Sequence, residues 1–243
     1  SKSKNNVVEP SAIIGKFGAD TARAFVMFAG PPDQSAAWSN SGAEGTFRFM
    51  RRLWNFGFTH QDVIKENVKL DASKLNHEEK AVRDIYTALK QAEFDLDRMQ
   101  YNTVVSAAMK MLNSLDTLKD NTSEGTRAVI NEGMSILLRT LYPIAPHITA
   151  QLFEDLGYDQ RFGTSIVDAP WPKIDAQAMV ADEVKYVIQI NGKLRGEINV
   201  PAETPKSEIE AAALANPDAQ RFIDGKPVRK IIVVPKKLVN IVV

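Results

Sequence analysis

Basic side chains in or beside predicted turns are the groups in this chain whose type and spacing could do chemistry. They gather toward the C-terminus, at Lys193, Arg195, Lys226, Arg229, Lys230, Lys236 and Lys237. Duplex RNA is recognised mainly through its shape, its phosphates and its 2′-hydroxyl groups, and phosphate contacts position a partner without reading its sequence. Any single one of these cations could equally be a solubilising charge, but the cluster as a whole favours docking of RNA.

A second group of cations opens the chain, in the sequence SKSKNN at residues 1–6. A lysine such as Lys2, held on a short loop, can stabilise the charge that develops on a transferring phosphate. Taken alone, such a sequence is usually a solvated terminus. Because the chain starts inside this loop without an initiator methionine, we expect it to be part of a longer protein.

The stretch Trp38–Trp54 carries a third basic group. Its members are Arg48, Arg51 and Arg52. We expect a helix capped at Ser41, because Ser41 and Glu44 have the spacing of a capping box. Apolar residues at spacings of three and four predict the face toward the core, namely Phe47, Met50, Leu53, Trp54 and Phe58. The arginines would then form a basic edge, and the alternative is a core helix with merely solvated arginines.

Three further segments, 76–99, 104–118 and 130–141, have apolar residues at alternating spacings of three and four. This spacing predicts helices with one buried face. Turn residues separate them at 101–103 and 121–125. Long apolar seams with short joints favour an antiparallel helical bundle, and each seam is too short and too interrupted for a coiled coil.

From Glu183 onward the apolar period changes to two, which predicts β-strands. The predicted strands are 184–190, 194–200, 228–234 and 238–243. The first two are joined by Asn191-Gly192, a dipeptide typical of tight hairpins, and Leu194 opens the buried face of the second. Two short helical segments separate the pairs. The order ββααββ predicts a small α+β domain with its helices on one face of the sheet.

The composition is that of a globular protein with a core: of 243 residues, 44% are hydrophobic and 25% charged. No run approaches the ~18 apolar residues of a membrane span, so we expect no membrane partner. The absence of cysteine excludes disulfides and thiolate metal sites, and the histidines lack ligand spacing, so we expect no metal. The net charge is zero, but ten Lys and Arg against seven Asp and Glu from Glu183 onward mildly favour a polyanionic partner there.

Three stretches together support a resemblance: SKSKNN, FGADTARAFVMFAGPPDQ and the pattern W-x3-G-x2-G-x2-RF-x2-R-x-W. They resemble the region after the catalytic core of class I aminoacyl-tRNA synthetases, most of all the bacterial-type leucyl-tRNA synthetases. In that family a KMSKS loop ends the nucleotide-binding core, and Ser1, Lys2 and Ser3 match its last three positions. The resemblance implies that Lys2 is catalytic, stabilising charge on the ATP phosphates, and that Lys2 and Ser3 belong to the ATP site.

The resemblance also implies a domain plan. Residues 1–32 would end the catalytic core, residues 33–181 would form the helical anticodon-binding domain with a proline-broken strap, and residues 182–243 would form a small tRNA-binding domain. The expected fold class is therefore mostly α, an antiparallel helical bundle followed by a small α+β (ββααββ) domain. The arginines of the stretch Trp38–Trp54 and the C-terminal cations would contact the tRNA.

For the full-length protein the resemblance implies activation of leucine with ATP and Mg, and ligation of leucine to tRNA(Leu), by a cytoplasmic monomer. This chain would hold the body and elbow of the tRNA. It would bind no cofactor by itself and would be inactive alone, because the main catalytic core and the editing domain lie outside it.

Two other interpretations are considered. Isoleucyl and valyl enzymes share the motifs GAD (residues 18–20) and PHI (residues 146–148). Isoleucyl enzymes commonly end in a cysteine zinc module and valyl enzymes in a coiled-coil arm, and this sequence fits neither. A free-standing RNA-binding or helical scaffold protein is the alternative from a different class. A natural reading frame extending upstream of Ser1 into a nucleotide-binding core would exclude that alternative.

Overall fold

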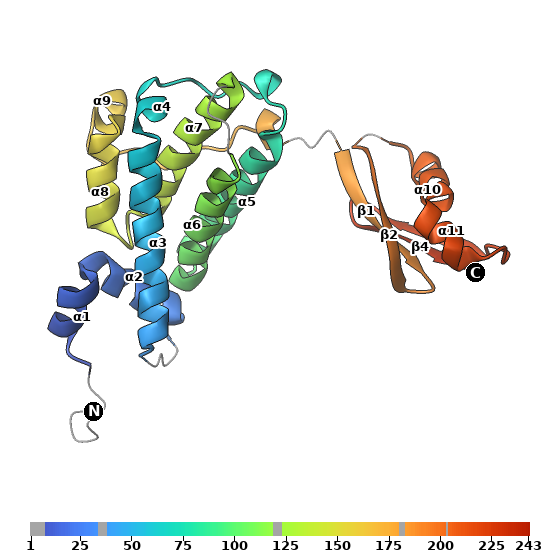
Figure 1. Cartoon of the computed structure of the whole chain (residues 1–243), viewed down its shortest axis with the longest axis horizontal. Helices are drawn as coiled ribbons and strands as arrows, with labels where there is room; N and C mark the ends of the chain where they lie inside the picture. Colours follow the sequence, from blue (N-terminus) through green and yellow to red (C-terminus); the bar gives the residue numbers. More distant parts are fainter. Residues whose placement is uncertain (1–7, 34–37, 119–122, 180–182, 203) are drawn as a thin grey trace. The chain divides into compact units, whose positions relative to one another are not determined.

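A computed structural model describes residues 8–33, 38–118, 123–179, 183–202 and 204–243 of the chain. The chain divides into two compact units, Ser1–Met179 and Val180–Val243 (Figure 1). The first is built from helices and the second from a sheet with two helices, and each has its own hydrophobic core. This confirms the predicted fold class, a helical bundle followed by a small α+β unit.

The first unit consists of helices. In chain order these helices are α1 (Pro10–Phe17), α2 (Ala19–Ala29), α3 (Asn40–Thr59), α4 (Gln61–Lys65), the 3-10 turn η2 (Ala72–Lys74), α5 (Glu79–Leu96), α6 (Tyr101–Asp116), α7 (Glu124–Leu141), α8 (Pro146–Asp155), α9 (Tyr158–Phe162) and η3 (Gln177–Met179). Helix α2 packs against α3 and α6, while α5 and α6 pack against each other and against α7.

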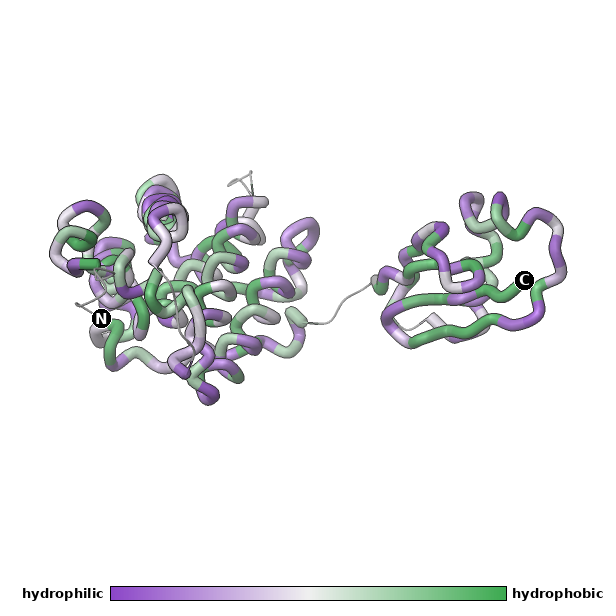
Figure 2. Tube along the Cα trace, turned by 90° about the horizontal axis from the view of Figure 1, so that it is seen from below, coloured by the Kyte–Doolittle hydropathy of each residue, from purple (hydrophilic) through white to green (hydrophobic). Residues whose placement is uncertain are grey.

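The apolar seams of α5, α6 and α7 meet in the core of this unit. Their buried members include Ile85, Leu89, Ala108, Met111, Met134 and Leu141. In Figure 2 hydrophobic and hydrophilic stretches alternate along the helices, as expected where each helix has one buried side. The predicted seam fails only at its end: α5 stops at Leu96, and Met99 lies beyond it with φ of 58° and is 59% exposed.

Helix α3, which carries the three arginines, begins earlier than predicted. Its N-cap is Ser39, whose hydroxyl accepts the Gly42 backbone N–H at 3.2 Å. The Ser41 hydroxyl instead lies 3.0 Å from the Ser39 hydroxyl, and Glu44 lies 4.0 Å from the ammonium of Lys16. The predicted capping box of Ser41 and Glu44 is therefore wrong, because another serine two residues upstream occupies the cap.

The buried face of α3 also differs from the prediction. Met50 and Leu53 are buried, but Trp54 is 39% and Phe58 66% exposed. The core side includes Ala43, Thr46, Phe49, Phe56 and Gly57 instead. A Cβ atom on Gly57 would lie 2.9 Å from the Leu152 side chain of α8. Two neighbouring strips of α3 are apolar, and the core takes the one whose small residues permit close helix packing.

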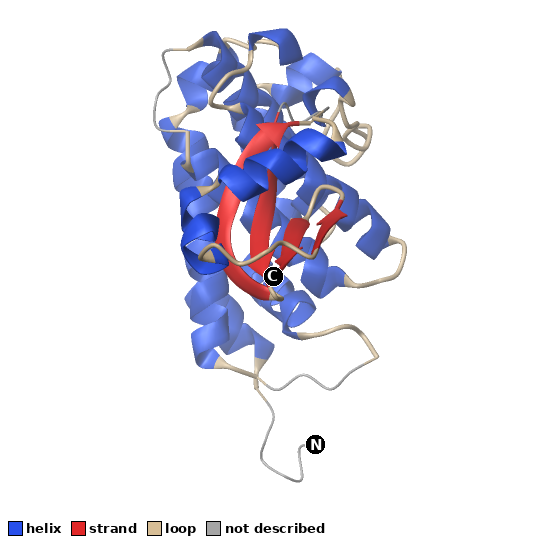
Figure 3. Cartoon of the chain, turned by 90° about the vertical axis from the view of Figure 1, so that its right-hand side faces the viewer, coloured by secondary structure: helices blue, strands red, loops and turns tan. Residues whose placement is uncertain are grey.

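The second unit is a four-stranded sheet with two helices. Its elements are β1 (Glu183–Ile190), β2 (Lys193–Pro201), α10 (Lys206–Ala215), α11 (Pro217–Ile223), β3 (Lys230–Val234) and β4 (Leu238–Val242). The strand order is β2-β1-β4-β3. The β1–β2 and β3–β4 pairs are antiparallel, whereas β1 and β4 run parallel. Figure 3 shows the helices in front of the sheet, and Tyr186, Ile188, Val239 and Ile241 are buried with α10 and α11 in one core.

The predicted hairpin between β1 and β2 is confirmed. Asn191 and Gly192 both have positive φ, 49° and 79°, as a two-residue type I′ turn requires. Asn191 also anchors the end of the chain, because its side-chain oxygen accepts the Val243 backbone N–H at 3.2 Å.

A bulge interrupts the β1–β2 ladder three residues into β2. Ile188 pairs with Gly196 and Gln189 with Leu194, so Arg195 is the extra residue. Because a bulge shifts the alternation by one position, Leu194 lies on the opposite face from the core and is 61% exposed. The prediction that Leu194 opens the buried face is therefore wrong.

Candidate functional site

The three arginines of α3 are in different situations. Arg48 and Arg51 are exposed, and no described side chain forms an ion pair with either of them. Arg52 is also on the surface, but it forms an ion pair with Asp116 of α6 and donates to the Asn113 side chain at 2.9 Å. Arg52 therefore links α3 to α6, and Arg48 and Arg51 offer the more available charge.

A cavity of about 550 Å³ lies beside Arg51. The α1–α2 corner, α3 and the start of α8 form its walls, and Phe17, Phe47, Met50, Arg51, Trp54 and His147 line it. The predicted core residues Phe47 and Trp54 thus belong to a surface pocket with a largely apolar lining.

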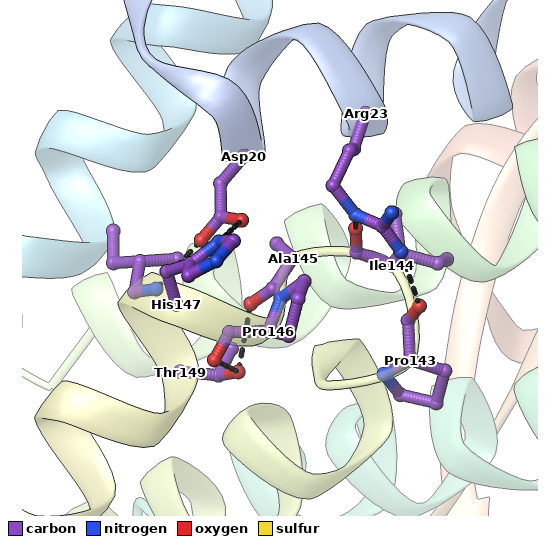
Figure 4. A network of polar contacts seen from close by, with 9 residues as sticks. Asp20, Arg23, Pro143, Ile144, Ala145, Pro146, His147 and Thr149 are labelled. Atoms are coloured by element: carbon purple, nitrogen blue, oxygen red, sulfur yellow. Dashed lines mark hydrogen bonds and ion pairs between the residues drawn. The ribbon is translucent and has the colours of Figure 1, made fainter.

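A network of polar contacts joins α2 to the turn between α7 and α8 (Figure 4). The Asp20 carboxylate accepts the Ile148 backbone N–H at 2.6 Å and lies 2.7 Å from Nδ1 of His147. One turn along α2, Arg23 donates to the carbonyls of Ile144 at 3.0 Å and Pro143 at 3.3 Å. In Figure 4 both side chains point from α2 toward the same turn.

This network satisfies a backbone N–H that the start of α8 leaves unpaired and two carbonyls of the α7–α8 turn. Asp20 supplies an acceptor and a negative charge at the start of α8, where the helix dipole favours an anion. Arg23 supplies a donor to carbonyls just past the end of α7. The sequence signal was the GAD motif followed by Arg23, but nothing local to it shows that its partners lie more than a hundred residues away.

A buried carboxylate joins the starts of α5 and α7. The Glu78 side chain is 2% exposed and accepts hydrogen bonds from the Ser123 hydroxyl at 2.6 Å, the Thr126 hydroxyl at 2.8 Å and the Asn76 backbone N–H at 3.0 Å. Burial alone would raise the pKa of Glu78, but these hydrogen bonds outweigh it and lower the pKa to about 2. The ionised carboxylate thus has a structural role in the bundle.

The sheet brings only some of the predicted C-terminal cations together. Strands β1 and β4 are parallel and β3 is antiparallel to β4, so the β1–β2 hairpin, the end of β4 and the start of β3 share one end of the sheet. We call the cations on these segments, together with Lys226 on the connection from α11 to β3, the hairpin-end cluster. It consists of Lys193, Arg195, Lys226, Arg229 and Lys230. The backbone N–H of Arg229, which donates to the Val242 carbonyl at 2.8 Å, fixes this arrangement.

Lys236 and Lys237 lie elsewhere, in the β3–β4 turn. The Lys236 backbone N–H donates to the Tyr186 hydroxyl at 3.0 Å, which places this turn beside the middle of β1. The predicted set of cations is therefore divided between the hairpin end of the sheet and the β3–β4 turn.

Ion pairing separates the predicted cations from the remaining ones of this unit. Lys185 pairs with Glu197, Lys206 with Glu210 and Arg221 with Asp218. Among the described residues, neither the hairpin-end cluster nor Lys236 and Lys237 form such a pair. Their charge is therefore available to an anionic partner.

Some predicted features lie outside the described residues. Lys2 and Ser3 belong to the segment 1–7, which the structure does not describe. Within the described ranges no group of three or more His, Asp or Glu side chains is placed to hold a metal ion. No helix of those ranges has the length and apolar character needed to cross a membrane.

Comparison with known families and proteins gives matches over most or all of the chain. Residues 78–211 match the family model described as the anticodon-binding domain of tRNA ligase. The chain is 54% identical over its whole length to a Leucine--tRNA ligase of Methylibium petroleiphilum and 50% identical to that of Leptothrix cholodnii. In each case it spans 27% of the relative's length.

A solved structure shares the fold. It is a LeuRS–tRNA–LeuAMS ternary complex from Agrobacterium radiobacter, with a TM-score of 0.84 and 24% sequence identity. The match covers 100% of this chain and 30% of that chain.

Proposed function

The chain belongs to the family of anticodon-binding domains of tRNA ligases, and we propose that it is the tRNA-binding part of a leucine–tRNA ligase. The observation that carries this proposal is its identity to enzymes named leucine–tRNA ligases across its whole length. The full-length enzyme activates leucine with ATP and Mg and ligates it to tRNA(Leu), as a cytoplasmic monomer.

The second unit, residues 182–243 in this proposal, docks on the elbow of the tRNA. Its support is the set of exposed cations that form no ion pair with described residues, at the hairpin-end cluster and at Lys236 and Lys237. Such cations displace condensed counterions from the RNA backbone, so affinity falls steeply as salt rises. The elbow is a folded duplex-like region, and exposed cations on a surface suit recognition of its backbone.

The helical unit holds the tRNA body through residues 33–181. Arg48 and Arg51 are the cations of α3 best placed to meet phosphates, and Arg52 can add a contact while it remains paired with Asp116. Upstream, residues 1–32 end the catalytic core. Lys2 stabilises charge on the ATP phosphates, and Lys2 and Ser3 belong to the ATP site.

The Asp20–Arg23 network gives the N-terminal segment a mechanical role in this proposal. It fixes α2 to the α7–α8 turn, so α2 is held rigidly on the bundle that binds the tRNA. Placing a catalytic lysine relative to a bound substrate requires such a rigid support.

A domain exchange tests the proposal. The matching C-terminal part of the Methylibium petroleiphilum relative would be replaced by this chain, and leucylation of tRNA(Leu) and leucine-dependent pyrophosphate exchange would be measured on the purified chimera. We expect both activities to be retained. A folded chimera that exchanges pyrophosphate but does not bind or leucylate tRNA(Leu) would refute the proposed role.

A further inference from the structure

We propose that Phe222 is a positioning residue for RNA binding, which holds the Arg195 guanidinium in place at the hairpin-end cluster. The inference rests on the proposed function, because it takes tRNA as the ligand. Arg195 is the cation that contacts phosphate, and Phe222 contributes to binding by holding Arg195 in place.

The contact between the two side chains is a cation–π stack. The Arg195 guanidinium carbon lies 4.0 Å from the centre of the Phe222 ring, well within the range of a favourable interaction. Phe222 is 43% exposed, so its ring lies at the surface, where the stacked guanidinium can meet an external anion. A stacked guanidinium keeps its N–H edges free for bidentate contact with phosphate oxygens.

The backbone is built to bring these residues together. The bulge at Arg195 removes it from the regular alternation of β2, and bulges commonly re-aim a side chain in this way. Next to it, the Asn216 side chain caps α11 and donates to the Glu197 carbonyl at 3.1 Å. A Cβ atom on Gly196 would lie 3.0 Å from the Asn216 side-chain oxygen, so the glycine lets α11 approach β2 closely.

The stack also joins the hairpin-end cations of β2 to those that follow α11. Lys193 and Arg195 come from β2, whereas Lys226 follows Phe222 by four residues and its backbone N–H donates to the Ile223 carbonyl at 3.0 Å. The contact thus connects the start of β2 to the segment that leads into β3. In the same part of the unit the neighbouring cation Arg221 is paired with Asp218, while no described carboxylate pairs with Arg195.

A double-mutant cycle on the whole chain tests this role with a tRNA(Leu) transcript as the probe. Phe222→Leu keeps apolar bulk but removes the π face, and it should weaken binding about two- to fivefold, the ratio a cation–π contact at an exposed site provides. Arg195→Ala should weaken binding and lower the salt slope by about one. Adding Phe222→Leu to Arg195→Ala should then cost nothing more, because the phenylalanine acts through the arginine.

Three further variants sharpen the test. Phe222→Tyr keeps the ring and should bind as the unaltered chain does, whereas Arg195→Lys keeps the charge but loses the planar stack and should resemble Phe222→Leu. Arg221→Ala removes a cation already paired with Asp218 and should leave the affinity nearly unchanged.

The outcomes separate this inference from the proposed function. An equal cost of Phe222→Leu with and without Arg195, or no cost at all, would overturn the positioning role while tRNA binding by the unaltered chain stands. Failure of the folded, unaltered chain to bind tRNA(Leu) would overturn the proposed function and this inference with it.

Discussion

The Glu78 carboxylate makes a strong prediction about stability and pH. Its pKa is about 2 in the folded chain against an ordinary value of 4.5. A shift of that size corresponds to about 3 kcal/mol of stability. The side chain is 2% exposed, so solvent screens this contribution little. Glu78→Gln keeps the shape but removes the charge, and it should lower the free energy of unfolding by about that amount at neutral pH.

The pH dependence has a defined sign. Because the folded pKa lies below the unfolded one, the folded chain binds fewer protons, and the contribution of Glu78 is complete above pH 4.5 and lost as pH falls toward 2. At about pH 3 less than half of it should remain. The deficit of the Glu78→Gln variant should therefore shrink from about 3 to about 1 kcal/mol between pH 7 and pH 3.

Tryptophan fluorescence during urea unfolding is the suitable assay. All three tryptophans, Trp38, Trp54 and Trp171, lie in the first unit, so the signal reports the bundle and not the sheet. Glu93→Gln changes an exposed glutamate of the same helix and should alter stability by no more than about 0.5 kcal/mol. A Glu78→Gln deficit that stays constant from pH 7 to pH 3 would refute the assignment of its stabilisation to the ionised form.

Three more predictions concern the Asp20 contacts, the hairpin-end cluster and catalysis by the chain alone. Asp20→Ala should destabilise the first unit by about 1–3 kcal/mol in the same assay, because it leaves the Ile148 N–H without its acceptor; an unchanged stability would remove the network's structural role. Changing Arg229 and Lys230 together to Ala should flatten the slope of log affinity for tRNA(Leu) against log salt by about two; a folded variant with an unchanged slope would make both merely solubilising. The chain alone should catalyse no leucine-dependent pyrophosphate exchange, and exchange above a mock preparation would contradict this.

Periodicity predicted the architecture because burial imposes it directly. A helix in a bundle must bury one strip and a strand on a sheet one face, so the seams of α5, α6 and α7 and the alternation in β1 follow from residue order alone. The same reasoning misjudged α3, where two adjacent strips are apolar. Gly57 decides between them, since α3 meets Leu152 there, and that contact is invisible without α8.

The bulge at Arg195 shows a second limit. Residues 194–200 read as an unbroken alternation, and the extra residue is detected only when β2 is paired with β1. Local sequence therefore assigned Leu194 to the core. The extra residue of a bulge has no partner on the neighbouring strand, so its side chain can contact another molecule instead of the core.

The division of the C-terminal cations depends on topology in the same way. In the order ββααββ the direction of the last two strands relative to the first hairpin is left open. Because β4 runs parallel to β1 and antiparallel to β3, the start of β3 lies at the hairpin end. Arg229 and Lys230 thereby join Lys193, which is far from them in sequence, while Lys236 is left at the other turn. A basic composition thus identifies an anionic partner, but strand order determines which cations can meet one stretch of its backbone at once.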